Sequence, residues 1–282
     1  LIFVEPAKTT QHLLLFTNLG NAIYRPIHEL TDTKWKDIGE HLSQTLTNFE
    51  QEEEILFAEI VDRFEGVTYF AATQQGQIKR FERKELSPWR TYRSKSTKYA
   101  KLKDQDDRIV AVAPVVLEDI MIITKNGYGL RFNIEEVPVV GAKAAGVKAI
   151  NLKDGDQVAA AFKSTTPSMY ILTQRGSLKR MLQDDIPVTS RAKRGLQVLR
   201  ELKNKPHRVF KAGPVFTDQG DFDLFTSQEE VAEQDQILQI TSTTGQVTEV
   251  DLTQLSISER TSNGSFVNDT ISDQEVFSAT IK

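Results

Sequence analysis

The feature that most constrains this chain is an internal repeat. One pattern occurs five times: an apolar strand, a short polar turn that ends in glycine, and a second strand closed by polar residues. Apolar β-branched and aromatic residues favour pleated strands, and glycine supplies the positive φ of a tight hairpin. The turn glycines are Gly20, Gly76, Gly127, Gly176 and Gly245. We therefore expect five β-hairpins, near residues 12–32, 68–88, 119–139, 168–188 and 236–257.

A second half-pattern follows the hairpins. A basic or glycine-containing segment, such as Gly141 to Lys148 or Arg191 to Leu196, leads into another apolar strand. Each repeat therefore comprises about four short strands in roughly 50 residues, which is typical of a propeller blade. We expect an all-β fold over residues 1–282, a single propeller-like domain of about five to six four-stranded blades.

Composition excludes several classes of site. The chain has no cysteine, which excludes disulfides, zinc–thiolate sites and thiol catalysis and favours a reducing cytoplasm. It contains no run of 18 apolar residues, so we expect no membrane span. Its four histidines are widely spaced and match no metal-binding pattern. We expect no metal and no cofactor.

Charge is strongly segregated along the chain although the net charge is only −4. The stretch Glu29–Glu65 has a net charge of −8 (3 basic, 11 acidic), and Ala212–Lys282 has −11 (2 basic, 13 acidic). Between them, Lys79–Arg108 has +6 (11 basic, 5 acidic) and Lys163–Lys211 has +9 (12 basic, 3 acidic). A basic middle favours a polyanionic partner, although unevenly charged solvated surface explains the pattern equally well.

Two strands carry the pattern Gly-x-Ile/Leu-Lys-Arg-Phe/Met, at Gly76–Phe81 and Gly176–Met181. Together with the basic segments and an Asp-x-Val-type strand, they resemble the C-terminal domains of bacterial type IIA topoisomerase A subunits. Within that family the chain is more similar to topoisomerase IV than to gyrase, because the glutamine-arginine-glycine-rich box of gyrase is absent. The resemblance implies a β-pinwheel whose blades exchange strands and whose basic outer rim binds and bends DNA.

DNA binding needs cations spaced along a surface that the phosphate backbone can follow. Lys79–Arg80 and Lys179–Arg180 occupy equivalent blade positions, with Arg25 and Arg131 as single counterparts, and the other candidates lie beside them or flank the later blades. Solvated strand-edge lysines that deter aggregation are the alternative explanation. The predicted DNA-binding residues are Arg25, Lys79, Arg80, Arg83, Arg90, Arg93, Lys95, Lys98, Lys125, Arg131, Lys143, Lys148, Arg175, Lys179, Arg180, Arg191, Lys193 and Arg194.

The resemblance implies a non-catalytic module that helps a topoisomerase IV holoenzyme select DNA crossings for decatenation and relaxation. Its implied partners are double-stranded DNA, the rest of the A subunit, which carries the catalytic tyrosine, and the ATPase B subunit. The implied location is the cytoplasmic nucleoid. The alternative is a propeller scaffold that binds proteins. A propeller enzyme is disfavoured, because the first strands of the hairpins carry apolar residues such as Leu14, Ile122 and Ile171.

Overall fold

Five hairpins organise the computed structural model, which describes residues 3–34, 36–216, 236–267 and 275–282. Each is antiparallel, and they are β1–β2 (His12–Thr17, Asn21–Pro26), β4–β5 (Thr68–Thr73, Gln77–Glu82), β8–β9 (Asp119–Thr124, Tyr128–Asn133), β12–β13 (Ser168–Thr173, Ser177–Leu182) and β16–β17 (Ile237–Ser242, Val247–Asp251). The described residues contain strands and six short 3-10 turns but no α-helix, which confirms the predicted all-β class. Within these residues, no helix is long and apolar enough to cross a membrane.

The same device closes four of the hairpin turns. The residue after the turn glycine donates its backbone N–H to a threonine hydroxyl at the end of the first strand, as in Tyr128 to Thr124 (3.1 Å) and Ser177 to Thr173 (3.2 Å). The threonine hydroxyl thereby replaces a backbone partner that the turn cannot supply. In the fifth hairpin the neighbouring Ser242 accepts this bond, from Gln246 at 3.2 Å.

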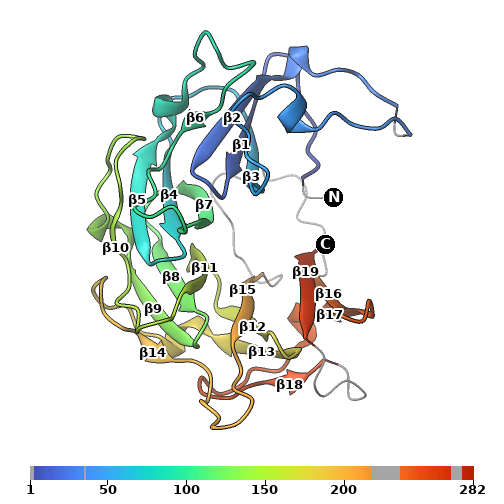
Figure 1. The fold of residues 1–282 in the computed structure, drawn as a ribbon. Helices are drawn as coiled ribbons and strands as arrows, with labels where there is room; N and C mark the ends of the chain where they lie inside the picture. The colour runs from blue at the N-terminus through green and yellow to red at the C-terminus, as the bar shows by residue number, and fades with distance from the viewer. Residues whose placement is uncertain (1–2, 35, 217–235, 268–274) are drawn as a thin grey trace. The chain divides into compact units, whose positions relative to one another are not determined.

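Each of the first four hairpins lies inside a four-stranded sheet. One neighbour of the hairpin is a long strand later in the chain, and the other is a strand of only two residues (Figure 1). In sheet order, the strands are β3 (Ile55–Val61), β1 (His12–Thr17), β2 (Asn21–Pro26) and β6 (Thr97–Lys98); β10 (Val147–Lys148), β5 (Gln77–Glu82), β4 (Thr68–Thr73) and β7 (Ile109–Val115); β11 (Val158–Lys163), β8 (Asp119–Thr124), β9 (Tyr128–Asn133) and β14 (Leu196–Gln197); and β15 (Val209–Val215), β12 (Ser168–Thr173), β13 (Ser177–Leu182) and β18 (Ser265–Phe266).

The fifth sheet has three strands among the described residues, in the order β17 (Val247–Asp251), β16 (Ile237–Ser242) and β19 (Val276–Ile281). The 3-10 turns follow or connect strands and are η1 (Ile27–Glu29), η2 (Leu42–Gln44), η3 (Arg83–Leu86), η4 (Ile134–Glu136), η5 (Gln183–Asp185) and η6 (Leu252–Gln254).

The two-residue strands are donated between repeats. β6 follows the second hairpin but pairs with β2 of the first, and β10, β14 and β18 complete the preceding sheets in the same way. This topology confirms the strand exchange that the family resemblance implied. We call the residues that lead into and include each donated strand its edge segment. The edge segments comprise residues 89–98, 141–148, 190–197 and 258–266.

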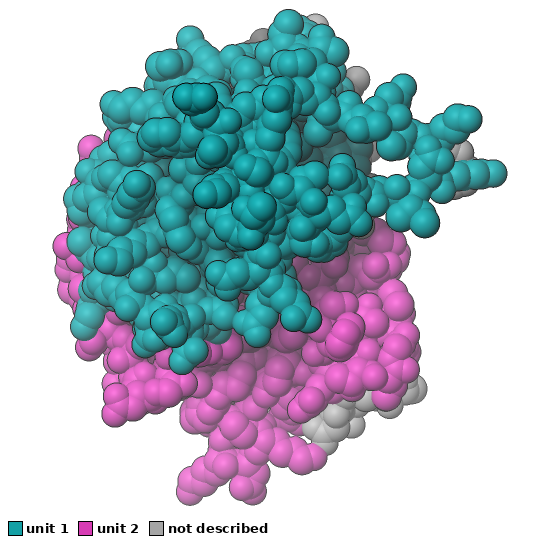
Figure 2. Space-filling view, turned by 45° about the horizontal axis from the view of Figure 1, so that its top comes forward, with its two compact units in different colours: residues 1–116, 137–148 teal, residues 117–136, 149–282 magenta. Residues whose placement is uncertain are grey.

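The chain divides into two compact units, and the division follows the donated strands (Figure 2). Unit 1, residues 1–116 and 137–148, contains the first and second sheets, including the donated β10. Unit 2, residues 117–136 and 149–282, contains the other three sheets.

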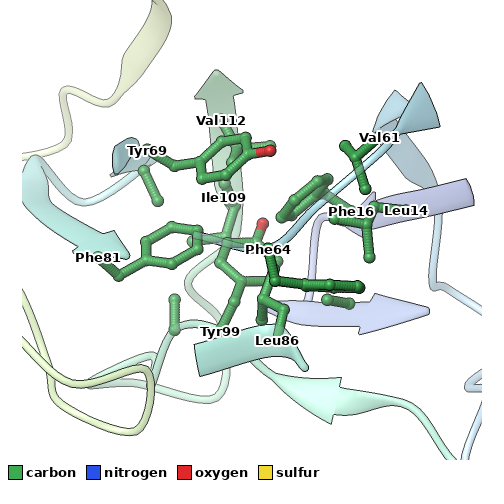
Figure 3. Close-up of a cluster of buried hydrophobic side chains, with 13 residues drawn as sticks. Leu14, Phe16, Val61, Phe64, Tyr69, Phe81, Leu86, Tyr99, Ile109 and Val112 are labelled. Atoms are coloured by element: carbon green, nitrogen blue, oxygen red, sulfur yellow. The ribbon is translucent and has the colours of Figure 1, made fainter. Parts of the chain in front are cut away.

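Each unit has its own apolar core. In unit 1, aromatic rings from both sheets meet: Phe16 lies 5.2 Å from Tyr69 and 5.3 Å from Tyr99 between ring centroids, and Tyr69 stacks on Phe81 at 5.4 Å (Figure 3). Ring pairs at such distances stabilise a core beyond the area that they bury. In unit 2, methionines and aliphatic residues fill the corresponding space. The apolar first strands of the hairpins thus serve as core.

Two buried lysines fasten edge segments to the sheets that they complete. Lys79 on β5 is 3% exposed, and Lys179 on β13 is 2% exposed. The Nζ atom of Lys79 donates to the carbonyl oxygens of Gly141, Ala142 and Ala144 in the edge segment of β10, at 2.9, 2.9 and 3.0 Å, and to that of Tyr99 at 3.0 Å.

Lys179 makes the equivalent contacts in unit 2. Its Nζ donates to the carbonyl oxygens of Arg260 (2.6 Å) and Ser262 (2.9 Å) in the edge segment of β18, and to that of Val198 (2.6 Å). Burial lowers the pKa of Lys79 to about 8 and that of Lys179 to about 7. A buried amine is costly unless its donors are satisfied, and the carbonyl oxygens satisfy them. We call this arrangement the lysine clasp.

The lysine clasp predicts a large difference between two lysines of unit 1. Lys79→Met keeps the aliphatic stem but leaves the buried carbonyl oxygens without their donor, so we expect the free energy of unfolding to fall by about 2–4 kcal/mol. Lys143→Met, on the exposed part of the same edge segment, should change it by less than about 0.5 kcal/mol. Urea unfolding of both variants measures the difference. Equal effects would contradict the clasp.

Glycine permits the close approach of an edge segment to its sheet in unit 2. Gly195 has a φ of +83°, and a Cβ there would overlap the carbonyl oxygen of Gly129 on β9. Gly155, in a loop of the same unit, has a similar φ of +75° but no atom within 4 Å of an added Cβ. The positive φ favours glycine at both positions, but only at position 195 is there also no space for a Cβ atom.

These two glycines form a matched pair for mutation. Gly155→Ala should lower the free energy of unfolding by about 1–2 kcal/mol, the cost of a left-handed backbone for alanine. Gly195→Ala should cost measurably more, because β14 must move away from β9. Thermal or urea unfolding checks the order, and a smaller loss for Gly195→Ala would refute the account of the edge approach.

Candidate nucleic-acid interface

The predicted DNA-binding residues fall into three groups according to exposure. Lys79, Lys179 and Arg83 are buried. The two lysines form the clasps, and Arg83 lies 3.4 Å from the carboxylate of Glu59. A DNA phosphate cannot reach these nitrogens without displacing their protein partners. Lys79, Lys179 and Arg83 therefore hold parts of the fold together, and the proposed interface does not include them.

The arginine that follows the clasp position also joins consecutive repeats. Arg80, Arg131 and Arg180 are half-buried, and each bonds to the 3-10 turn of the next repeat or to the residue directly after it. Backbone bridges accompany these contacts at all three positions. The pairs are Arg80 Nε to the Val137 carbonyl (2.6 Å), Arg131 to the Asp184 carboxylate (2.7 Å) and Arg180 to the Thr253 carbonyl (2.6 Å).

Four further half-buried cations are also bonded to protein groups. Arg25 donates to the carbonyls of Tyr92 (2.8 Å) and Arg93 (3.3 Å), although it lies one residue beyond the position equivalent to Arg80. The other three are Lys125, which donates to Gln157 (2.7 Å), Arg175, which donates to the Lys205 carbonyl (2.7 Å), and Arg191, which donates to the Glu136 carbonyl (3.1 Å).

Eight predicted residues are exposed, and all of them lie on edge segments. Unit 1 presents six of them on two edge segments, and unit 2 presents two on a third. The donated strands therefore hold exposed cations at the edges of three consecutive sheets, and the segment of β10 is also held by a lysine clasp. The eight are Arg90, Arg93, Lys95, Lys98, Lys143, Lys148, Lys193 and Arg194.

Local contacts position two of these side chains. Arg194 donates to the hydroxyl of Tyr128 at 2.8 Å, and its guanidinium lies 4.7 Å from the centre of that ring. Arg93 donates to Glu29, and this pairing, with the Tyr92 hydroxyl, lowers the pKa of the Glu29 carboxyl to about 2. A phosphate that binds Arg93 must compete with that carboxylate.

Sequence analysis missed three cations of unit 1. Lys101, Lys103 and Arg108 lie in the loop that connects β6 to β7, and together with Lys98 and Lys143 they line one hollow. The net charge of the surrounding stretch indicated them. Lys103 and Arg108 also have cationic counterparts in other repeats, namely Lys153, Lys203 and Arg208, whereas Asn151 and Glu201 stand at the places equivalent to Lys101.

The fifth hairpin departs from the cationic pattern. Glu249 on β17 is exposed and accepts a hydrogen bond from Gln239 at 3.0 Å. The acidic stretch 218–235 lies outside the described residues.

Comparison with known proteins gives a consistent result. The family model described as the DNA gyrase C-terminal domain, beta-propeller, matches residues 11–62, 69–115, 118–165 and 168–215, which contain the first four hairpins. The chain is 65% identical over 281 residues to the DNA topoisomerase 4 A subunit of Streptococcus pyogenes serotype M3 and 42% identical over 205 residues to that of Bacillus subtilis. These matches cover 99% and 72% of the chain but only 34% and 25% of the two relatives.

Solved structures agree with the sequence matches. The crystal structure of a C-terminal domain of DNA topoisomerase IV superposes with a TM-score of 0.83 at 34% identity, covering 97% of this chain and 79% of the other. A gyrase A C-terminal domain superposes with a TM-score of 0.69 at 19% identity, covering 98% and 83%, which shows a common fold. These likenesses confirm the predicted propeller-type fold. The chain belongs to the family of DNA gyrase A C-terminal domains, and within it to the C-terminal domains of topoisomerase IV A subunits.

Proposed function

We propose that this chain is a non-catalytic module that binds and bends duplex DNA through the exposed cations of its edge segments. One observation carries the proposal: the same strand-donation device presents exposed lysines and arginines on three consecutive edge segments. Phosphate contacts of this kind supply affinity without sequence preference. The proposed interface comprises the eight exposed residues, with Arg191 beside them.

Bending follows from how the cations are held. Each of the three edge segments is fixed to its sheet by strand pairing, and that of β10 is also held by a lysine clasp. A duplex that contacts several segments must therefore adapt to the protein. Bending a site by 40–90° costs about 1–6 kcal/mol, which several phosphate contacts can offset.

In the whole protein, we propose that the module helps a topoisomerase IV holoenzyme capture the DNA crossings that it decatenates or relaxes. The support is the 65% identity to a topoisomerase 4 A subunit, of which this chain spans about a third. Its partners would then be double-stranded DNA, the remainder of the A subunit, which carries the catalytic tyrosine, and the ATPase B subunit. Its location would be the cytoplasmic nucleoid. We further propose that both compact units act together as one DNA-binding domain.

The salt dependence of binding tests the proposal. If about six phosphates are contacted, the logarithm of the association constant should fall against the logarithm of salt concentration with a slope near −5. A duplex of about 40 base pairs with dyes on both ends should also shorten its end-to-end distance on binding, as energy transfer reports. Absence of binding at low salt would contradict the proposal and favour a protein-binding scaffold; binding without end approach would contradict bending.

Charge reversal separates the interface from the clasp. Lys193→Glu with Arg194→Glu should weaken binding to unrelated duplexes by similar factors while the unfolding midpoint stays near that of the parent chain. Lys179→Glu should instead lower the unfolding midpoint, because it places a carboxylate among buried carbonyl oxygens. Duplex titrations and circular dichroism measure both quantities. Unchanged affinity in the double variant would remove that edge segment from the interface.

A further inference from the structure

A hollow of about 610 Å³ lies in unit 1 beside the donated strand β6. Its walls come from β6 and the loop after it, residues 98–108, from Lys143 in the edge segment of β10, and from Leu19 and Glu50. Two successive edge segments therefore meet around it. A ligand that contacts both edge segments can therefore also contact the residues that line this hollow.

The hollow is strongly basic. Five cations line it, against the two carboxylates of Glu50 and Asp104, for a net charge of +3. Opposing walls that carry the same charge repel one another unless a counter-charge lies between them. The cations are Lys98, Lys101, Lys103, Arg108 and Lys143.

Three of these cations are held by protein contacts. Lys98 donates to the Leu19 carbonyl (3.1 Å) and Lys103 to the Gln77 side chain (2.7 Å). Arg108 donates to two carbonyls of its own loop and, at 3.0 Å, to Glu52. These contacts fix the walls in position before any ligand arrives.

The other two cations have no such contact. Lys101 and Lys143 are exposed, and within the described residues neither forms a hydrogen bond or an ion pair with the protein. They come from two different segments that line the hollow, Lys101 from the loop after β6 and Lys143 from the segment before β10. Two unneutralised ammonium groups on a preformed basic hollow are suited to bind an anionic oxygen group.

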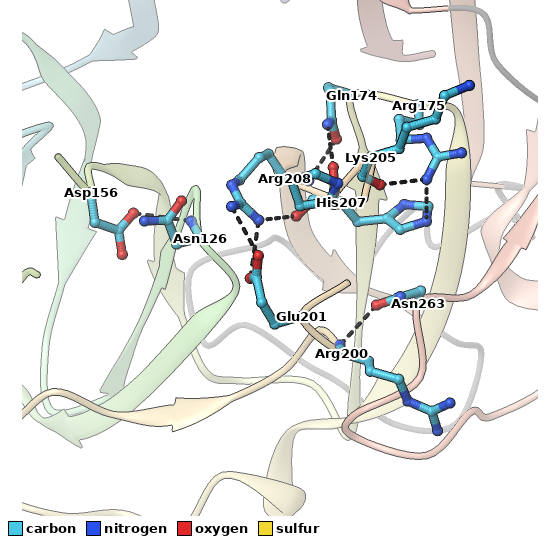
Figure 4. Close-up of polar contacts among 11 residues, drawn as sticks. Asn126, Asp156, Gln174, Arg175, Arg200, Glu201, Lys205, His207, Arg208 and Asn263 are labelled. Atoms are coloured by element: carbon cyan, nitrogen blue, oxygen red, sulfur yellow. Dashed lines mark hydrogen bonds and ion pairs between the residues drawn. The ribbon is translucent and has the colours of Figure 1, made fainter. Parts of the chain in front are cut away.

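The equivalent junction in unit 2 differs in charge. A hollow of about 380 Å³ lies between the loop after β14 and the edge segment of β18, and its charged residues are Arg200 and Glu259, one of each sign. Nearby groups are already paired: Arg208 binds Glu201, and Asn263 accepts the backbone N–H of Arg200 at 2.8 Å (Figure 4). The same architecture thus produces one basic hollow and one neutral hollow.

We propose that the unit 1 hollow is a seat for the phosphates of the DNA backbone, contacted by Lys101 and Lys143, and that the unit 2 hollow is not. This inference rests on the proposed DNA-binding function and adds that affinity is distributed unequally among the repeats. Duplex DNA is the occupant that we propose, because the same two edge segments carry further exposed cations, such as Lys95 and Lys148, which a phosphate backbone could follow beyond the hollow.

The test compares charge-neutralising variants of the whole chain. Lys101→Gln with Lys143→Gln removes two phosphate contacts, so the salt slope of duplex binding should become less steep by about 2, and affinity at low salt should fall. Arg200→Gln with Lys203→Gln removes two exposed charges beside the neutral hollow and should leave the slope within about 0.5 of the parent value. Circular dichroism and melting show that both variants keep the parent fold.

The outcomes separate this inference from the function on which it rests. If the parent chain binds DNA and the Lys101/Lys143 variant retains its slope, the seat is overturned while the DNA-binding function stands. Equal losses in the two double variants overturn the unequal distribution. Failure of the parent chain itself to bind at low salt overturns the function and, with it, the seat.

Discussion

Each of the first four sheets depends on two residues that belong to the following repeat. A two-residue strand offers few backbone hydrogen bonds, so pairing alone gives it little stability. The structure supplements this pairing in two places with a buried lysine whose amine bonds to the carbonyl oxygens of the donated segment. At the equivalent positions Ile23 and Leu130, buried apolar side chains stand instead. Repeats are thereby joined by side chains as well as by the chain itself.

This arrangement also explains where the exposed charge lies. An edge segment forms the outermost strand of its sheet, so some of its side chains pack against the protein and others lie in solvent. In the edge segment of β10, backbone carbonyls turn toward the clasp while the side chain of Lys143 remains exposed. A segment that is fixed in place by its backbone can present long cations to a phosphate backbone without moving. In the basic hollow of unit 1, several such cations lie around one site.

Much of the fold was predictable from the sequence, because hairpins are local. Apolar strands around a glycine turn identified all five hairpins. The site was harder to predict. Lys79 and Lys148 are both lysines on strands, and nothing in their local sequence shows that one is buried and the other exposed. That difference arises from the donated strand, a contact between residues about 65 positions apart. The loop cation Lys101 posed the opposite problem, because Asn151 and Glu201 stand at its place in other repeats and no repeated motif therefore marks it.

In this structure the clasp residues Lys79 and Lys179 hold donated segments in place, and we propose that the exposed lysines of the edge segments bind DNA. Lysine acetylation with a small reactive ester, mapped by mass spectrometry with and without a bound duplex, tests this division directly. We predict that Lys79 and Lys179 stay unmodified in both states, while Lys101, Lys143 and Lys193 react in the free chain and are protected by DNA. Modification of Lys79 and Lys179 in the free chain, with protection by the duplex, would contradict it.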